Sequence, residues 1–457
     1  MQHVTKAVLK TIMLRTATVP MISTFQKHAF TIALALIAAV NSILFIFFVE
    51  KASIRVPVVD LLDWLQFYGE RSKDDNWLGY LWTPHNEHRM VFSRILLALD
   101  VKFFGDEGEA FAASGFFLLL GMVATICWEI LKSNVSISWK LTAIPIAVLL
   151  LSPANTVVMI GMQTMGAFLQ ASSFGLFSLA LLDGAGEQDH FSKYRRAAAI
   201  VCACLAAFGD SGGLLIWPAL MWSAWKGGLR WRWIAGIACV GTLFIAVYLW
   251  SLPSPSVSRS TDFDHLIRSF DYVMRFLGLP WSHTHDLVWP ARFIGLSIFC
   301  LGCFAVVSAS FSARVSTSKR LGMALILFSF SIAGAAALAR VDVAVDREMP
   351  IRYGMFVVLA HLGLLLWSLD FLEQLWHGAY RRSFQWVLLG ICLTWVGQQI
   401  VVGYFAIEEA KRYKDAWSRF VAGDWTPDML HYVYPDRERA QAGLSYLRAS
   451  GLFKATD

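Results

Sequence analysis

Residues 56–105 read VPVVDLLDWLQFYGERSKDDNWLGYLWTPHNEHRMVFSRILLALDVKFFG, and this stretch decides how the rest of the chain is interpreted. It forms most of a polar insertion, 51–108, between an apolar run at 28–49 and another at about 109–131. An apolar run of about 20 residues is long enough to cross a bilayer as a helix. The sequence therefore predicts two membrane spans joined by a large loop.

The composition is that of a membrane protein with many spans. Of the 457 residues, 57% are hydrophobic and 16% are charged, and the mean hydropathy is +0.54. These values exclude an ordinary soluble domain. The net charge of +6 comes largely from Lys and Arg in short loops. Such charges orient a chain in the membrane, and they give no reason to expect a nucleic acid as partner.

The hydropathy pattern predicts an all-α polytopic membrane protein with about 11 transmembrane helices, in a range of 9 to 13. The stretches 140–152 and 197–209 are shorter than a bilayer requires. Pro153 and the turn 209–213 predict broken or re-entrant helices there. The predicted spans are 28–49, 109–131, 140–152, 165–182, 197–209, 213–225, 233–250, 291–310, 321–339, 353–370 and 385–404.

The predicted organisation has three parts, which are a cytoplasmic segment 1–27, a membrane domain 28–407 and an extracytoplasmic tail 408–457. Most basic residues of the short loops fall on the N-terminal side of the membrane, which places the N-terminus in the cytoplasm. The loop with Arg340, Arg347 and Arg352 breaks this rule. We therefore expect these arginines to have a function.

Amphipathic helices are predicted in the two large outer loops, 51–108 and 251–290. After Pro57, the spacing puts Asp60 and Asp63 on one face of a short helix. A second helix is expected to start at Thr83-Pro84 and to end at Gly105, with an apolar stripe that lies on the membrane surface. In the other loop, residues 263–277 carry a similar stripe, and a last helix is expected near the C-terminus.

Two acidic residues of the first loop are candidates for catalysis. Asp60 could take the proton of an attacking hydroxyl or could hold a metal beside a leaving phosphate. Asp63 is the substitute on the same face. The alternative is structural, because an acid in the first turn of a helix complements the helix dipole.

Two basic groups are candidates for binding a lipid-linked phosphate. His85, His88 and Arg89 lie in the first loop, and Arg340 and Arg352 flank a later one; each group can donate hydrogen bonds to phosphate. The alternative is that these side chains snorkel towards lipid headgroups. Tyr353, beside Arg352, is also a candidate, although interfacial tyrosines are common. A zinc site at His85 and His88 is not expected, because the spacing is not that of a zinc motif and no third ligand is evident.

The arrangement resembles the GT-C superfamily of membrane glycosyltransferases, with an Asp soon after the first span in a large outer loop. The resemblance implies that Asp60 is the catalytic acid, with Asp63 in reserve. The run PHNEHR at 84–89, the ALAR…IRY segment at 337–353 and the tail PDRERAQAGLSYLRASGLF are similar to a group of bacterial membrane proteins of this build. This chain has Ile351 where serine is usual, and no DxD or ExD stands in the loop, which leaves a divalent cation open.

The resemblance implies an inverting glycosyltransferase of the bacterial cytoplasmic membrane. Its donor would be a sugar on a polyprenyl phosphate, and its acceptor an envelope glycan, lipid or protein on the outer face. Besides these partners, only membrane lipids are expected. One alternative is a transporter or flippase of a lipid-linked or small anionic substrate, which predicts inverted repeats and ionisable residues near the middle of the membrane. Another is a noncatalytic scaffold for envelope assembly.

Overall fold

A computed structural model of the chain describes residues 28–73, 76–86, 88–105, 108–152, 166–183, 192–252, 262–281, 288–341, 351–424, 426–434 and 436–451. Three of the sequence-based expectations fall outside these ranges, namely the N-terminal segment 1–27, Pro153 and the second arginine of the 340–352 loop, Arg347.

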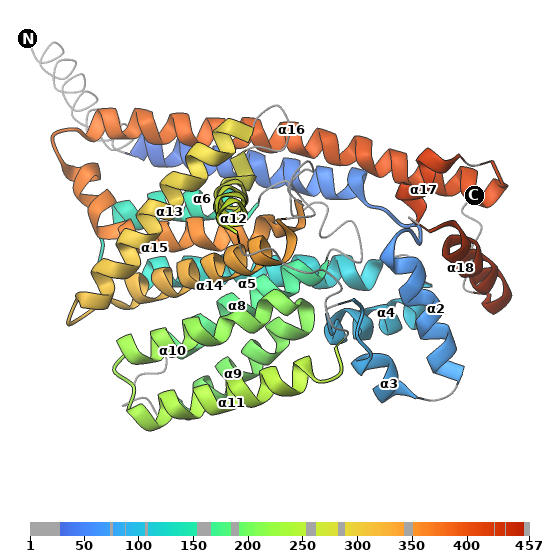
Figure 1. The fold of residues 1–457 in the computed structure, drawn as a ribbon. Coiled ribbons are helices and arrows are strands. Elements are labelled where there is room, and N and C mark those ends of the chain that lie inside the picture. Colours follow the sequence, from blue (N-terminus) through green and yellow to red (C-terminus); the bar gives the residue numbers. More distant parts are fainter. Residues whose placement is uncertain are drawn as a thin grey trace, which may run out of the picture.

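The described residues form a bundle of helices without β-strands, as predicted (Figure 1). Eight of the helices are long and apolar enough to cross a membrane, which is compatible with a multi-pass membrane protein. These eight are His28–Ala52, α5 (Glu109–Lys132), α8 (Gly166–Asp183), α11 (Trp231–Leu249), α13 (Val288–Phe311), α14 (Thr317–Arg340), α15 (Gly354–His377) and α16 (Arg381–Ala422).

Three further helices coincide with the shorter predicted spans, namely α6 (Ile137–Leu151), α9 (Ser192–Gly209) and α10 (Ile216–Lys226). The helical structure is interrupted between α9 and α10, at the predicted turn. Asp210 and a short 3-10 helix, η2 (Ser211–Leu215), connect the two. Such irregular backbone is tolerated within a membrane protein only where protein or a polar cavity satisfies it.

The centre of the bundle is formed by α8, α14 and α15, whose apolar residues are mostly buried. Helices α14 and α15 approach closely at Gly322 and Gly363. A Cβ atom added to Gly322 would lie 2.5 Å from the carbonyl oxygen of Gly363. Small residues that allow backbones to meet are the usual basis of helix packing in membranes. This rigid centre supports the residues at the end of α14 and the start of α15.

The first loop and the tail lie together at one end of the bundle, at the right of Figure 1. The loop folds into α2 (Asp60–Lys73), α3 (Trp77–Trp82) and α4 (Val91–Phe103), and the tail into α17 (Pro427–Val433) and α18 (Arg437–Ser450). Helix α16 has 42 residues and is therefore about 63 Å long. It carries the tail from the far end of the bundle to the first loop. We call this end, with the first loop and the tail, the loop end.

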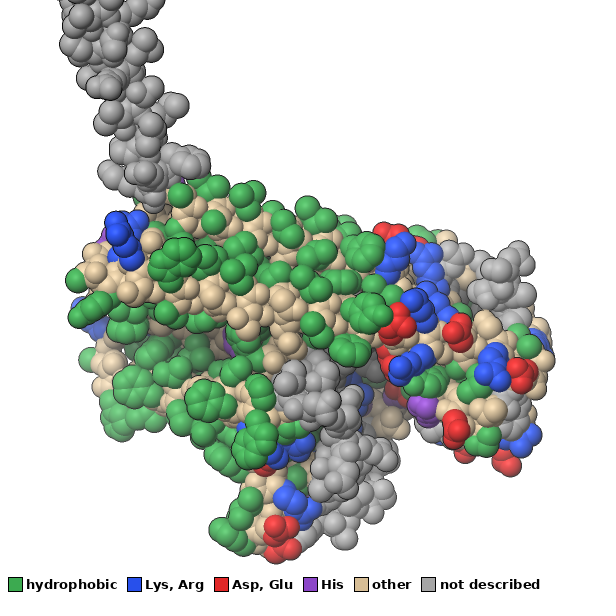
Figure 2. Space-filling view, turned by 90° about the horizontal axis from the view of Figure 1, so that it is seen from above, with side chains coloured by type: hydrophobic (Ala, Val, Ile, Leu, Met, Phe, Trp, Pro, Cys, Tyr) green, Lys and Arg blue, Asp and Glu red, His purple; other side chains and the backbone are tan. Residues whose placement is uncertain are grey.

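The surface separates by chemistry in the way that a membrane protein requires. Figure 2 shows hydrophobic side chains over most of the face that includes α16, many charged side chains at the loop end, and smaller charged groups at the opposite end and at the lower edge of the view. The turns α10–α11, α13–α14 and α15–α16 lie at the opposite end in Figure 1. These three turns include Lys226, Arg230, Arg314 and Arg381, so the predicted basic loops share one end.

Two of the predicted amphipathic helices present an apolar face outward. In α4, Ser93, Arg94 and Asp100 point into the protein, whereas Ile95 and Phe103 are exposed. The other is α12 (Phe263–Leu277), which matches the predicted boundaries and exposes Phe263, Leu266, Ile267 and Phe270. Their position on the membrane surface stays a prediction.

The tail docks directly on α2. The N–H of Val59 donates to the carbonyl oxygen of Val433 at 2.6 Å, and Val59 adopts a φ of 54°, which is unfavourable for a β-branched residue. In the α2–α18 contact, Gly443 packs on Leu62, so close that a Cβ atom added to Gly443 would lie 2.6 Å from the Leu62 Cγ. The tail therefore fixes the backbone immediately before Asp60.

Replacing Gly443 by valine is expected to release α18 from α2. Leu62 is 1% exposed and has little room to move, so overpacking should weaken docking by about 1–3 kcal/mol. Hydrogen exchange of the α18 amides should then become faster than in the wild type. Ser445→Val, on the exposed face of α18, is the matched control and should leave the exchange unchanged. Equal protection in both variants would contradict the docking.

Candidate functional site

The PHNEHR run forms a tight turn and does not start a helix as predicted. His85 and His88 exchange two backbone hydrogen bonds of 2.8 and 2.9 Å, with Asn86 at a φ of 50°. Thr83 donates from its N–H and its hydroxyl to the carbonyl of Gly79, so it ends α3. Helix α4 begins later, at Val91. The expected helix start at Thr83-Pro84 was therefore wrong, because the hydrogen-bond donors of Thr83 bind the preceding helix, α3, and do not cap a following one.

Arg89 holds this turn against the bundle. It is 1% exposed, and its guanidinium lies 4.5 Å from the Trp82 ring centre. Its Nε donates to the Tyr248 carbonyl at 2.7 Å, and its two Nη atoms donate to the carbonyls of Trp82 and Trp250. Because these contacts occupy the guanidinium, we take Arg89 out of the predicted phosphate-binding set and assign it a structural role.

Arg89→Leu is expected to lower the free energy of unfolding by about 3 kcal/mol or more, because buried carbonyls lose their donor at about 1–3 kcal/mol each. Chemical denaturation in detergent measures the change. Arg412, an exposed residue of α16 with a 3.7 Å ion pair to Glu409, is the control, and Arg412→Leu should cost less than about 1 kcal/mol. A stable Arg89→Leu chain that has lost ligand binding would return Arg89 to the binding set.

Asp60 opens α2 and faces His85. Its Oδ2 lies 3.6 Å from the His85 Nε2, the distance of an ion pair. Burial alone would raise the pKa of Asp60. The interaction with His85 and the charges of Arg352 and His88 outweigh burial, and they hold the pKa below its usual value. The structure thus brings together one predicted acid and three predicted basic residues, and Asp60 stays ionised at neutral pH.

The lowered pKa gives Asp60 a defined pH signature. A carboxyl group whose pKa is lower in the folded state stabilises the fold above its unfolded pKa of about 3.9. That contribution is lost as the pH falls through the lower folded pKa. The Tm advantage of the wild type over Asp60→Asn should therefore be present at pH 5–7 and should decline progressively below about pH 4. An advantage that grows on acidification would contradict the assignment.

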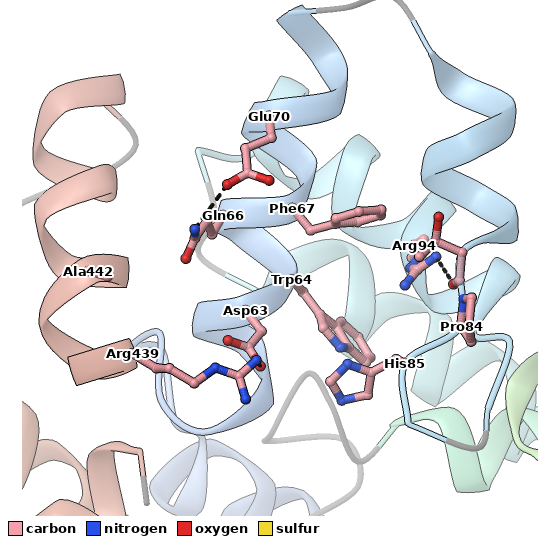
Figure 3. Close-up of a pocket in the computed structure, with 11 residues that line it drawn as sticks. Asp63, Trp64, Gln66, Phe67, Glu70, Pro84, His85, Arg94, Arg439 and Ala442 are labelled. Carbon is pink, nitrogen blue, oxygen red and sulfur yellow. Dashed lines mark hydrogen bonds and ion pairs between the residues drawn. The ribbon is translucent and has the colours of Figure 1, made fainter. Parts of the chain in front are cut away.

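Asp63 is held by the tail. Its Oδ2 accepts hydrogen bonds from the Tyr434 hydroxyl at 2.6 Å and from an Arg439 Nη at 3.3 Å. It is one helical turn from Asp60 but turns towards α18, where Figure 3 shows Arg439 reaching across to it. These contacts favour a role for Asp63 in docking the tail.

Two cavities lie on either side of the His85–His88 turn. The outer cavity, of about 310 Å³, lies between α2, the 83–85 turn and α18, and it includes His85 and Asp63 (Figure 3). The inner cavity, of about 240 Å³, reaches into the bundle and includes His88, Arg340 and Tyr353. Five of the eight predicted site residues therefore line one of these two cavities, whereas Asp60, Arg89 and Arg352 line neither of them.

The inner cavity is polar at one end and apolar along its wall. His88, Asp210 and Arg340 supply the polar groups. The wall consists of aliphatic side chains from η2 and α14, namely Leu214, Leu215, Ile332, Ala335, Ala336 and Ala339. Such a lining suits a ligand with a charged head and a hydrocarbon chain.

Asp210 is a site residue that the sequence interpretation left without a role. It is 4% exposed, and its Oδ1 accepts from the N–H of Gly212 at 2.8 Å. The N–H of Ser211 donates to the His88 Nδ1 at 3.3 Å, and the Asp210 Oδ2 lies 3.3 Å from the same nitrogen. An acid inside an apolar stretch was the available signal, since such residues are functional by default.

Arg340, Arg352 and Tyr353 come together at the ends of α14 and α15. Tyr353 is buried, and its ring contacts Phe168 and Phe276 at centroid distances of 5.8 and 5.3 Å. Burial raises the pKa of the Tyr353 phenol, although both arginines act in the opposite direction. The phenol therefore stays protonated and can donate a hydrogen bond.

No family model, no curated protein and no solved structure matches the chain. In the described part of the chain, no group of three or more His, Cys, Asp or Glu residues could hold a metal ion. The site instead contains two carboxylate–imidazole pairs, Asp60–His85 and Asp210–His88, beside two arginines. Its groups are suited to proton transfer and to binding an anion.

Proposed function

We propose that the chain is an integral membrane glycosyltransferase of the GT-C type. It transfers a sugar from a polyprenyl phosphate to an envelope glycan, lipid or protein, on the outer face of the bacterial cytoplasmic membrane. The single observation that carries the proposal is the position of Asp60. This ionised acid lies 3.6 Å from His85, which lines the outer cavity, and within the electrostatic influence of Arg352 and of His88, which lines the inner cavity.

Transfer proceeds by direct displacement at the anomeric carbon. The acceptor hydroxyl attacks that carbon while its proton passes to the Asp60 carboxylate. The bond from the anomeric carbon to the phosphate oxygen breaks, and the electron pair leaves with the polyprenyl phosphate. The new glycosidic bond forms on the opposite face of the sugar, so the configuration inverts.

The leaving phosphate gains charge, and the inner cavity, together with Arg352 beside its Tyr353, supplies groups that oppose it. Arg340, Arg352 and His88 stabilise the phosphate, and Tyr353 can donate a hydrogen bond to it. The polyprenyl chain extends along the aliphatic wall of η2 and α14. This arrangement is supported by the division of that cavity into a charged end and an apolar wall.

The proposed topology has eleven spans, with α6, α9 and α10 as the short ones, and a cytoplasmic N-terminus. It is supported by the basic turns at the end opposite the first loop. Cysteines introduced at exposed positions of α2 and of the α13–α14 turn test it. A membrane-impermeant maleimide should label only the former from outside the cell, and the reverse pattern would contradict the topology.

The activity is tested with the purified chain in proteoliposomes and a radiolabelled polyprenyl-phosphate sugar. The proposal expects release of polyprenyl phosphate, slowly with water and faster with an acceptor glycan. If no donor turns over with glycan, lipid or peptide acceptors, the chain is not a transferase of this kind.

A further inference from the structure

The outer cavity has no part in binding the donor phosphate, and its lining differs from that of the inner cavity. Its volume of about 310 Å³ is at the lower end of the range of small-molecule sites, about 300–1,000 Å³. Its walls come from α2, from the turn before α4 and from α18. The polar groups of α2 that face it are amide and carboxylate side chains.

These polar groups form a row along α2. Gln66 and Glu70 lie one helical turn apart, and the Gln66 Nε2 donates to the Glu70 Oε1 at 2.9 Å. Asp63 lies at the start of the row, and Arg439 of α18 faces it (Figure 3). Planar amide, carboxylate and guanidinium groups offer paired donors and acceptors. Such pairs match the neighbouring hydroxyl groups of a sugar ring.

One buried hydrogen-bond donor among the lining residues of this cavity indicates a ligand. Trp64 is 2% exposed, and within the described ranges its indole Nε1 has no hydrogen-bond partner. The ring stands edge-on to the His85 imidazole at 5.7 Å, and both residues line the cavity. A buried N–H without an acceptor is unfavourable. A hydroxyl oxygen in the cavity would satisfy it.

The charges of the lining favour a neutral ligand over an anion. Asp63 and Glu70 contribute two carboxylates, while Arg439 pairs with Asp63. The guanidinium of Arg94 donates to the carbonyls of Tyr80 and Thr83, so it is directed at the protein backbone. No excess of positive charge remains to attract a phosphate.

We infer that the outer cavity binds a neutral sugar unit of the acceptor. The inference rests on the proposed transferase function, and it specifies the acceptor as a glycan. Trp64 is one turn of α2 from Asp60, and His85 lies 3.6 Å from Asp60 while also lining the cavity. A hydroxyl of a sugar bound there is therefore close to the base that removes its proton.

The test measures binding of methyl glycosides of neutral hexoses to the full-length chain in nanodiscs by saturation-transfer NMR. The wild type should bind at least one of them. Gln66→Leu and Trp64→Phe should each weaken that binding about 3- to 10-fold, the effect of losing a hydrogen bond. Gln441→Leu, the same change on the exposed surface of α18, is the matched control and should bind normally.

A second arm separates the acceptor from the donor. Hydrolysis of the lipid-linked donor without acceptor should be unchanged in Gln66→Leu. If it falls in parallel with glycoside binding, the cavity holds the donor sugar and the inference is overturned. Absence of glycoside binding by the wild type, or equal binding by Gln66→Leu, also overturns it. A third outcome is that glycoside binding depends on Gln66 but the chain never turns over donor. That outcome would support the sugar site and contradict the transferase function.

Discussion

Replacing Asp60 by asparagine is expected to reduce sugar transfer by about 100- to 10,000-fold, the usual contribution of a general base. Asparagine keeps the size of the side chain and can still face His85, but it cannot accept the proton of the acceptor hydroxyl. Turnover of the radiolabelled donor with saturating acceptor measures the loss. The KM for donor should change little, because Asp60 does not hold the phosphate.

Asp63→Asn is the matched control for this prediction. It removes the same charge one turn along α2, where Tyr434 and Arg439 hold the carboxylate. We expect it to loosen the tail and to keep transfer within about tenfold of the wild type, because the lost contacts are hydrogen bonds of modest net strength. Full activity in Asp60→Asn with loss in Asp63→Asn would exchange the roles of the two acids.

Replacing Arg340 by glutamine is expected to raise the KM for the lipid-linked donor about 10- to 100-fold, because a charge-assisted hydrogen bond contributes about 1.5–3 kcal/mol. Arg340 stands at the end of α14 and lines the inner cavity with His88 and Tyr353. The change should appear in donor binding and in kcat/KM. Arg340→Lys should recover part of the affinity, because it keeps the charge and loses the planar geometry.

Arg314→Gln provides the comparison at the other end of the bundle. Arg314 is exposed in the α13–α14 turn and lines a separate cavity of about 340 Å³ with Lys319 and Asp370. The Arg314→Gln substitution should leave the KM for the lipid-linked donor unchanged. An equal effect of Arg314→Gln and Arg340→Gln would mean that the arginines act through general electrostatics, with no specific contact.

Hydropathy alone located the long helices, because burial in lipid demands apolar runs of a fixed length. It also located α12 and α18 through their periodic residues. It could not give the structure of the PHNEHR turn. That turn depends on Arg89, whose acceptors include carbonyls of Tyr248 and Trp250. Such partners lie far away in the sequence and leave no local signal.

The candidate site could be predicted only in part, because some of its contacts also join residues that lie far apart in the sequence. The sequence predicted that Asp60 would lie near His85, His88 and Arg352. This prediction needed only that the first outer loop folds over the arginines beside the end of α14 and the start of α15. The role of Asp210 depends on the break between α9 and α10 meeting His88. The separation of Asp63 from Asp60 depends on α18, which contributes Arg439 from the other end of the chain. These contacts come from tertiary packing, which residue spacing does not encode.

The most direct test is an electron cryomicroscopy structure of the chain with a non-hydrolysable phosphonate analogue of a polyprenyl-linked sugar. We expect the phosphonate within hydrogen-bonding distance of Arg340 or Arg352, the lipid chain along η2 and α14, and the anomeric carbon facing Asp60. Density for the headgroup in the cavity of Arg314 and Lys319, or midway through the bundle as in a transporter, would contradict the proposed function.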